Sequence, residues 1–146
     1  MRRFVWRLQR VLDVRVKQEQ VKRTELFRVT QELAERRTEL LLRQQTLREA
    51  LASIGDENSS QRIGQQEMVL RYAATNDEQI RRIKEVLHTL ELRQKERLNE
   101  LLAVRRSREA LERLREEARQ QFIQEQEKLD QKESDERAVI AFMRNR

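Results

Sequence analysis

An apolar stripe along residues 80–129 constrains the fold more than any other feature of this sequence. Counting forward from Ile80 to Leu129 by alternate steps of three and four residues gives fifteen positions, and ten of them are apolar. A stripe with a mean period of about 3.5 residues on a charged helix is typical of a coiled coil. Because exposing such a stripe to water is unfavourable, the helix requires a partner helix. The fifteen positions are Ile80, Ile83, Leu87, Leu90, Gln94, Arg97, Leu101, Val104, Arg108, Leu111, Arg115, Ala118, Phe122, Glu125 and Leu129.

The composition also indicates long helices in an all-α fold. The chain has 146 residues, of which 40% are charged and 37% hydrophobic, with two Gly and no Pro. Compact domains turn their chains with Gly and Pro, which are nearly missing here. We therefore expect one coiled-coil domain over residues 1–146, in which a thin seam between helices replaces a three-dimensional core.

A first helix is expected over residues 4–53. Its strongest feature is an apolar row that repeats every seven positions and is broken only by Glu19. A second row, placed four residues after members of the first, is mostly polar. One apolar row and one polar row favour a pair of helices over a bundle interior. The first row comprises Val5, Leu12, Leu26, Leu33, Leu40, Leu47 and Ile54, and the second comprises Thr30, Arg37, Gln44 and Leu51.

Residues 54–75 should form a short, partly helical connector to a second helix. Gly55 suits the position just past the end of the first helix. The stretch Thr75–Glu78 matches a capping box, which would start the long helix at about residue 76 and carry it to about 143. Such a stretch also occurs inside continuous helices, so the sequence leaves open whether the helix breaks at Thr75.

The break at Gly55 favours a long antiparallel two-helix coiled-coil hairpin with both termini at one end. The expected second helix is longer than the first by roughly five turns, and this excess must overhang or be covered by the connector. The charge distribution points the same way. Residues 1–30 hold nine Lys and Arg against three acids, which is the whole net charge of +6, whereas residues 124–136 hold six acids and two Lys. Opposite charges near the two ends of the chain favour their meeting. An extended dimer of two chains is the alternative.

No group of residues in the sequence indicates catalysis. His88 is the only histidine, and there is no cysteine, no glycine-rich phosphate loop and no Ser-His-acid set. The many carboxylates follow helical spacing, as expected of solvated helix faces. A thin seam offers no cavity in which pKa values could shift. We therefore expect a protein that is not an enzyme and that binds no cofactor and no metal.

The sequence further predicts a cytoplasmic protein. The lack of cysteine fits a reducing compartment. No apolar run approaches the roughly 18 residues that cross a bilayer, so no integral membrane segment is expected. Arg7 and Arg10 interrupt the apolar residues near the N-terminus, which is unlike a signal peptide.

The basic N-terminal segment could bind a membrane surface, nucleic acid or a protein. On a helical wheel Trp6 lies opposite Phe4 and Leu8, where it could anchor the chain at a lipid interface or in a protein pocket. Nucleic acid is not expected, because the Arg residues alternate with seam positions and stacking aromatics are few. In the simplest alternative the N-terminus is frayed and Trp6 contacts nothing.

With these residues in view, the chain resembles the FliJ family, small coiled-coil proteins of the bacterial flagellar type III export apparatus. The likeness covers the whole chain and rests mainly on its two ends. Counterparts in virulence-type secretion systems share the architecture. The matching residues are Phe4, Trp6, Leu8, Val11, Leu12, Arg15, Glu19 and Leu26 at one end, and Lys128, Leu129, Asp130, Asp135, Glu136, Phe142, Met143 and Arg144 at the other.

This resemblance implies a fold similar to the stalk subunit of rotary ATPases. It also implies that the paired ends dock into the ring of the flagellar export ATPase, and that the protein contacts the membrane export-gate protein and late-substrate export chaperones. The expected role is to couple the ATPase to the gate, at the cytoplasmic face of the inner membrane. A basic coiled coil that binds membrane or nucleic acid is the alternative function.

Two groups of candidate site residues follow. The aromatic and arginine residues of the ends are the candidates for ATPase binding, and an apolar patch near the turn of the hairpin is the candidate for gate binding. In the alternative for this patch, Ile80 and Ile83 simply pack against Leu47, Leu51 and Ile54. The ATPase candidates are Arg3, Phe4, Trp6, Arg7, Arg10, Phe142 and Arg144; the gate candidates are Met68, Val69, Tyr72, Ile80 and Ile83.

Overall fold

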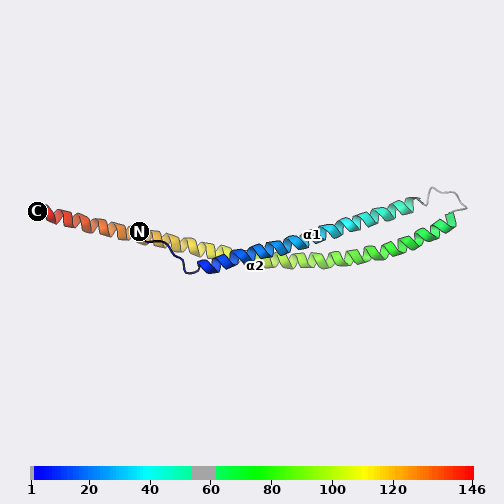
Figure 1. The fold of residues 1–146 in the computed structure, drawn as a ribbon, viewed down its shortest axis with the longest axis horizontal. Helices are drawn as coiled ribbons and strands as arrows, with labels where there is room; N and C mark the ends of the chain where they lie inside the picture. Colours follow the sequence, from blue (N-terminus) through cyan, green and yellow to red (C-terminus); the bar gives the residue numbers. More distant parts are fainter. Residues whose placement is uncertain (1, 54–61) are drawn as a thin grey trace. The chain divides into compact units, whose positions relative to one another are not determined.

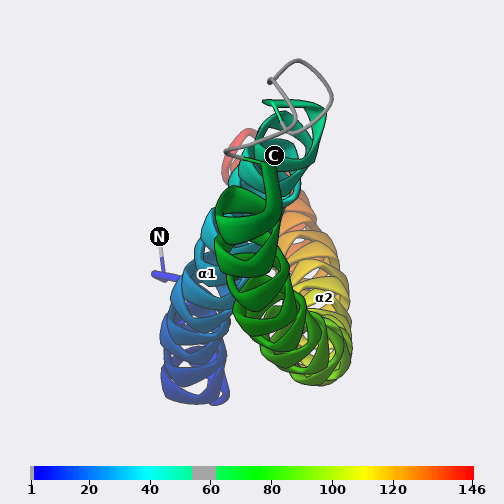
Figure 2. The same ribbon diagram turned by 90° about the vertical axis from the view of Figure 1, so that its right-hand side faces the viewer.

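Two long helices make up nearly all of the computed structural model, which describes residues 2–53 and 62–146. Helix α1 spans Gln9–Ser53 and helix α2 spans Arg62–Arg144. The two helices pack against each other in opposite directions (Figures 1 and 2). No strand occurs in either described stretch. The predicted all-α helical hairpin is therefore confirmed.

Both helices begin at residues other than those expected. Helix α1 begins at Gln9 rather than residue 4, after a turn in which the Gln9 amide donates to the Trp6 carbonyl at 3.2 Å. Phe, Val and Trp are weak helix formers, so side-chain contacts decide the conformation of the segment before Gln9. Helix α2 begins at Arg62 and continues through Thr75. The Thr75 hydroxyl donates to the Arg71 carbonyl at 3.0 Å, as inside a helix, and does not cap a helix start.

The predicted connector over residues 54–75 is thus helical from Arg62 onward, as part of α2. Gly55 and Ile54 lie outside the described residues. Contacts divide the chain into two units: Val21–Leu101, here called the central unit, and Met1–Gln20 with Leu102–Arg146, here called the terminal unit. Each unit contains a part of α1 beside a part of α2.

The core of the central unit is a small apolar seam. Leu33 of α1, only 2% exposed, packs with three buried residues of α2, and the half-buried Leu40 packs against this cluster. The seven-residue row of α1 faces this seam as predicted, because Leu26, Leu33, Leu40 and Leu47 are all buried or half-buried. The buried residues of α2 in the cluster are Ile83, Leu87 and Leu90.

The second row of α1 lies one position earlier than predicted. Val29 is buried at 8% exposure, whereas its neighbour Thr30 is exposed. Lys22 and Arg43 belong to the same row and are half-buried. Long side chains can lay their methylene groups along a seam and keep their charge at its rim, which is why charged residues can occupy this row.

In the terminal unit, the N-terminal segment lies against α2. The rings of Phe4 and Phe122 lie 5.4 Å apart between centroids and are tilted by 53°. Leu12 and Glu19 are buried farther along α1. From residue 127 onward every residue of α2 is exposed, so this end of the helix has no covering helix within the described chain.

Candidate functional site

The first candidate surface is the N-terminal segment itself. Phe4 and Trp6 are half-buried, and Val5 is 80% exposed. Residues 4–8 and Ala118 line a shallow hollow of about 550 Å³. The contact with Phe122 shows that this segment is held on α2, which excludes the frayed terminus as a description of Phe4.

The arginines of this segment are exposed cations. Arg3, Arg7 and Arg10 are all solvent-exposed, and none of them forms an ion pair or hydrogen bond with another described residue. Unpaired guanidinium groups beside an aromatic hollow suit an acidic protein surface, because each can still form bidentate hydrogen bonds with a carboxylate.

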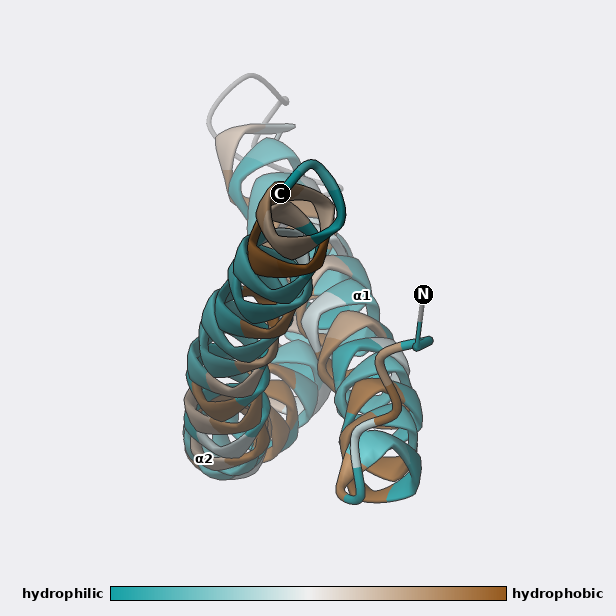
Figure 3. Cartoon of the chain, turned by 90° about the vertical axis from the view of Figure 1, so that its left-hand side faces the viewer, coloured by the Kyte–Doolittle hydropathy of each residue, from teal (hydrophilic) through white to brown (hydrophobic). Residues whose placement is uncertain are grey.

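The two remaining ATPase candidates lie elsewhere. Phe142 is 66% exposed and lies under the Arg146 guanidinium, whose carbon is 5.5 Å from the ring centroid; Arg144 is also exposed. Phe142 follows Phe122 by twenty residues on one continuous helix, a separation of roughly 30 Å at about 1.5 Å per residue. The expectation that the two termini lie together is therefore wrong, because the N-terminal segment packs at Phe122 and α2 continues past it to the C-terminus (Figure 1). Figure 3 shows this end of the chain coloured by hydropathy.

The predicted gate patch divides into exposed and buried residues. Met68 and Tyr72 are 73% and 45% exposed, and Val69 is half-buried. Ile80 and Ile83 are only 8% and 7% exposed. These two isoleucines occupy the seam, and Ile83 packs with Leu33, Leu87 and Leu90 rather than with Leu47 or Leu51. They cannot serve as an exposed contact, so the patch consists of the remaining three residues.

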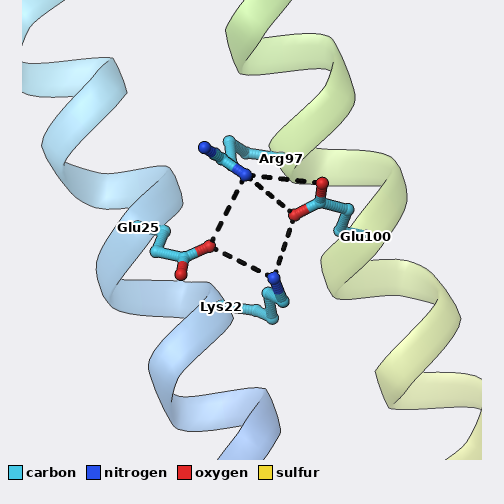
Figure 4. A network of polar contacts seen from close by, with 4 residues as sticks. All are labelled: Lys22, Glu25, Arg97 and Glu100. Atoms are coloured by element: carbon cyan, nitrogen blue, oxygen red, sulfur yellow. Dashed lines mark hydrogen bonds and ion pairs between the residues drawn. The ribbon is translucent and has the colours of Figure 1, made fainter.

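Charged residues form a four-membered network across the seam of the central unit (Figure 4). The Lys22 ammonium lies 3.4 Å from Glu25 and 3.1 Å from Glu100, and the Arg97 guanidinium lies 3.2 Å from Glu100 and 3.9 Å from Glu25. The hydrogen bond from Lys22 lowers the pKa of Glu100, and the hydrogen bond to Glu100 raises the pKa of Lys22. This network was not predicted.

Two more polar contacts cross between the helices. In the terminal unit Glu19 pairs with Arg108, and the hydrogen bonds that the Arg108 guanidinium donates to Glu19 raise the pKa of that guanidinium. In the central unit the buried Asn76 amide donates to the Arg43 carbonyl at 3.2 Å, and the Arg43 guanidinium bonds to Gln79. The signal for the first pair was present in the sequence, since Glu19 breaks the seven-residue row of α1 and Arg108 is one of the charged positions in the stripe of α2.

The described residues contain no group of three His, Cys, Asp or Glu side chains that could hold a metal ion. His88 is exposed on α2. Within the described stretches, neither helix contains a segment that is apolar enough to span a membrane.

Comparison with known proteins identifies one family. The family described as the flagellar FliJ protein matches residues 4–146, which is nearly the full length of the chain. No curated protein and no solved structure matches the chain. Because the match includes both the N-terminal aromatic segment and the uncovered end of α2, the chain belongs to the flagellar FliJ protein family.

Proposed function

We propose that this protein is a non-enzymatic component of flagellar type III export that binds the export ATPase and the membrane export gate and so couples them. Membership of the FliJ family supports a role in flagellar export and favours the flagellar system over a virulence-type one. The observation that carries the ATPase contact is the N-terminal segment, which combines a held aromatic pair with unpaired arginines.

The ATPase surface is proposed to have two parts. One is the N-terminal segment with Arg3, Phe4, Trp6, Arg7 and Arg10, and the other is the uncovered end of α2 with Phe142 and Arg144. Their separation of roughly 30 Å, from the helix rise of about 1.5 Å per residue, is compatible with a deep socket such as the interior of a ring. A continuous helix would hold the two parts at a fixed spacing.

The gate surface is proposed to be the exposed side of α2 around Met68 and Tyr72, with Val69 beside them. An exposed aromatic and an exposed methionine one helical turn apart suit an apolar pocket of a partner. Late-substrate export chaperones are proposed as further partners from family membership alone. These partners would place the protein in the cytoplasm, at the inner face of the membrane.

The ATPase contact is tested with Trp6→Ala in a binding titration of the purified protein with the cognate ATPase. Truncating an aromatic anchor commonly costs about 2 kcal/mol or more of binding free energy, so affinity should fall at least about tenfold. The matched control is Tyr72→Ala, which removes an aromatic ring from the other surface and should leave ATPase affinity unchanged. Unchanged affinity in Trp6→Ala, with helix content retained, would remove Trp6 from the site.

The gate contact is tested with the double variant Met68→Ala/Tyr72→Ala against both partners. Loss of gate binding with retained ATPase binding and melting temperature supports two separate surfaces. Equal loss of both, or a large fall in melting temperature, would place the gate contact elsewhere.

A membrane surface is the competing partner for the N-terminal segment. Four exposed arginines and Val5 could also bind anionic lipid. Sedimentation with vesicles of anionic phospholipid at physiological salt separates the two functions. Lipid binding that exceeds ATPase binding, and that Trp6→Ala abolishes, would favour the membrane. A parallel titration with duplex DNA should show no binding.

A further inference from the structure

Two strongly charged segments of the terminal unit have no charged partner in the chain. The acids of residues 124–136 form no ion pair with any described residue, and the same holds for the basic residues Arg7, Arg10, Arg15 and Lys17 of the N-terminal region. The sequence predicts that these segments meet, because their charges are opposite. Within one chain the two segments do not meet. The N-terminal segment contacts α2 at Phe122, and the acidic segment lies farther along α2, after this contact.

The basic region also carries an apolar face that nothing in the described chain covers. Leu8, Val11 and Val14 recur at steps of three residues, so they share one side of the start of α1. They are 40%, 43% and 52% exposed, whereas Leu12, on the side toward α2, is 4% exposed. This face therefore presents valine and leucine between flanking cations.

The acidic segment offers the matching surface. Leu129 is 49% exposed, and the same alternate steps that define the seam of α2 continue from it through Lys132 and Glu136 to Val139 and Met143, which are 55% and 71% exposed. Of these positions, only Leu129 is an apolar residue within residues 124–136. An uncovered helix that carries unpaired carboxylates around an exposed leucine favours a basic partner surface that also exposes apolar side chains.

We propose that two copies of this chain associate with two-fold symmetry, the acidic segment 124–136 of each copy lying on the basic valine face of the other. The two surfaces exist on one chain and are complementary in charge, and each exposes apolar side chains: Leu8, Val11 and Val14 on one and Leu129 on the other. Because each copy contributes both surfaces, a two-fold axis forms two equivalent contacts and leaves neither surface open. This association goes beyond the proposed role in export. Because it would cover Arg7 and Arg10, which are also proposed to bind the ATPase, a second copy and the ATPase would compete for this face.

Charge-reversed variants give a specific test. One variant, Arg10→Glu/Lys17→Glu, reverses charges of the basic face; the other, Glu133→Lys/Glu136→Lys, reverses charges of the acidic segment. Each alone should weaken self-association at least tenfold in sedimentation equilibrium, because like charges would face each other in both contacts. An equimolar mixture of the two variants should dimerise as the unaltered protein does, because both contacts then pair opposite charges again.

The control variant Glu85→Lys/Glu96→Lys makes the same change of charge at two exposed positions of α2 in the central unit, outside both surfaces, and its self-association should remain unchanged. Far-ultraviolet circular dichroism should show that every variant keeps its helix content. A chain that stays monomeric throughout the micromolar range overturns the proposal. So does a mixture of the two variants that fails to restore association.

Disulfide trapping tests the direction of the contact, and the chain has no cysteine of its own. Along α2, Val11 and Leu129 lie on opposite sides of the contact between Phe4 and Phe122. Cysteines at these two positions would therefore be too far apart to form a disulfide within one chain. Mixing the two single variants, Val11→Cys and Leu129→Cys, under oxidising conditions should give a mixed disulfide dimer. Preferential linkage of Leu129→Cys to itself would instead show that the uncovered helices pair with each other.

Discussion

Glu19 of α1 and Arg108 of α2 form an ion pair in the seam of the terminal unit, and each interrupts the apolar row of its own helix. Glu19 is 4% exposed and is the most buried charged group among the described residues. A buried charge is tolerated only opposite a partner, so any shift of one helix along the other would leave two unpaired charges. The pair therefore selects one register of the antiparallel helices.

Breaking this pair should destabilise the protein more than removing an exposed partner of the same arginine. Arg108 also contacts Glu112 at 2.8 Å, and Glu112 is about half exposed. Glu19→Ala should lower the urea midpoint clearly, because Arg108 then loses its buried partner, whereas Glu112→Ala should have little effect. The double variant Glu19→Leu/Arg108→Leu should recover most of the loss. Equal midpoints for both single variants would show that burial of Glu19 contributes nothing.

The network of the central unit should make stability depend on pH. The pKa of Glu100 lies below its usual value of 4.5 in the folded protein, so its contribution is complete above that value and is lost as pH falls through the folded pKa. The pKa of Lys22 lies above its usual value of 10.5, so its contribution is complete below that pH and is lost as pH rises through the folded pKa. The network is therefore expected to stabilise the fold fully between about pH 5 and 10.

The variant Glu100→Gln tests how the stability of the fold depends on pH at acidic pH. The difference in urea midpoint between the unaltered protein and the variant should stay constant from neutral pH down to about pH 5 and shrink below the usual pKa of 4.5. Because these side chains are 30–41% exposed, added salt should also reduce the difference. Glu116→Gln is the control, since Glu116 forms no ion pair among the described residues. A difference that does not change with pH would contradict the network.

The sequence was sufficient to predict the helices and most of the seam. Ile80, Ile83, Leu87 and Leu90 are buried as their spacing predicts, because a 3.5-residue period leaves one face of a helix to bury. The row of Leu26, Leu33, Leu40 and Leu47 faces inward for the same reason. The spacing of apolar residues is a property of one helix, so it can be read from the sequence without knowing which helix packs against it.

Features that depend on how the two helices match were not predictable in this way. The second buried row of α1 contains Val29 rather than Thr30. Which of the two is buried depends on which charged residues of α1 can pack their methylene groups against α2. The level at which the N-terminal segment crosses α2 depends on the contact of Phe4 with Phe122, two residues 118 positions apart. The separation of Phe142 from Phe4 follows from this contact together with the register set by Glu19 and Arg108. The exposed end of α2 is the overhang that the unequal helix lengths allowed.

Truncation of Leu33 should show how much of the stability lies in the small apolar cluster. Leu33 is 2% exposed and packs with three residues of α2. Leu33→Ala should lower the free energy of unfolding by about 2–5 kcal/mol, the range for buried leucines. Leu41 on the same helix is 66% exposed, and Leu41→Ala should change the free energy of unfolding by no more than about 0.5 kcal/mol. Chemical denaturation followed at 222 nm measures both.

Substitution of Thr75 should distinguish a continuous helix from a capped start. Inside a helix, Thr75→Ala should keep or slightly raise stability, because Ala is the better helix former. At an N-cap the same change would cost about 1 kcal/mol. Thr75→Pro should cost about 3 kcal/mol or more, since it would remove an interior backbone hydrogen bond. A clear loss in Thr75→Ala would restore the break at this residue.

Distance measurements between labels should locate the N-terminal region along α2. Phe4 contacts Phe122 and Glu19 pairs with Arg108, so Arg10 should lie near residue 116. A spin-label pair at Arg10 and Glu116 should therefore give a short distance in pulsed electron resonance. A pair at Arg10 and Lys132 should give a clearly longer distance, because Lys132 lies roughly 24 Å farther along α2, from sixteen further residues at about 1.5 Å each.

The same pair of labels also separates contacts within a chain from contacts between chains. Diluting the doubly labelled protein with unlabelled chain should leave the short distance between Arg10 and Glu116 unchanged, because both labels belong to one hairpin. If α1 instead paired with α2 of another chain, dilution would remove that distance. A short distance between Arg10 and Lys132 that disappears on dilution would instead be a distance between two chains. It would support the proposed contact in which the acidic segment 124–136 of one copy lies on the basic face of the other.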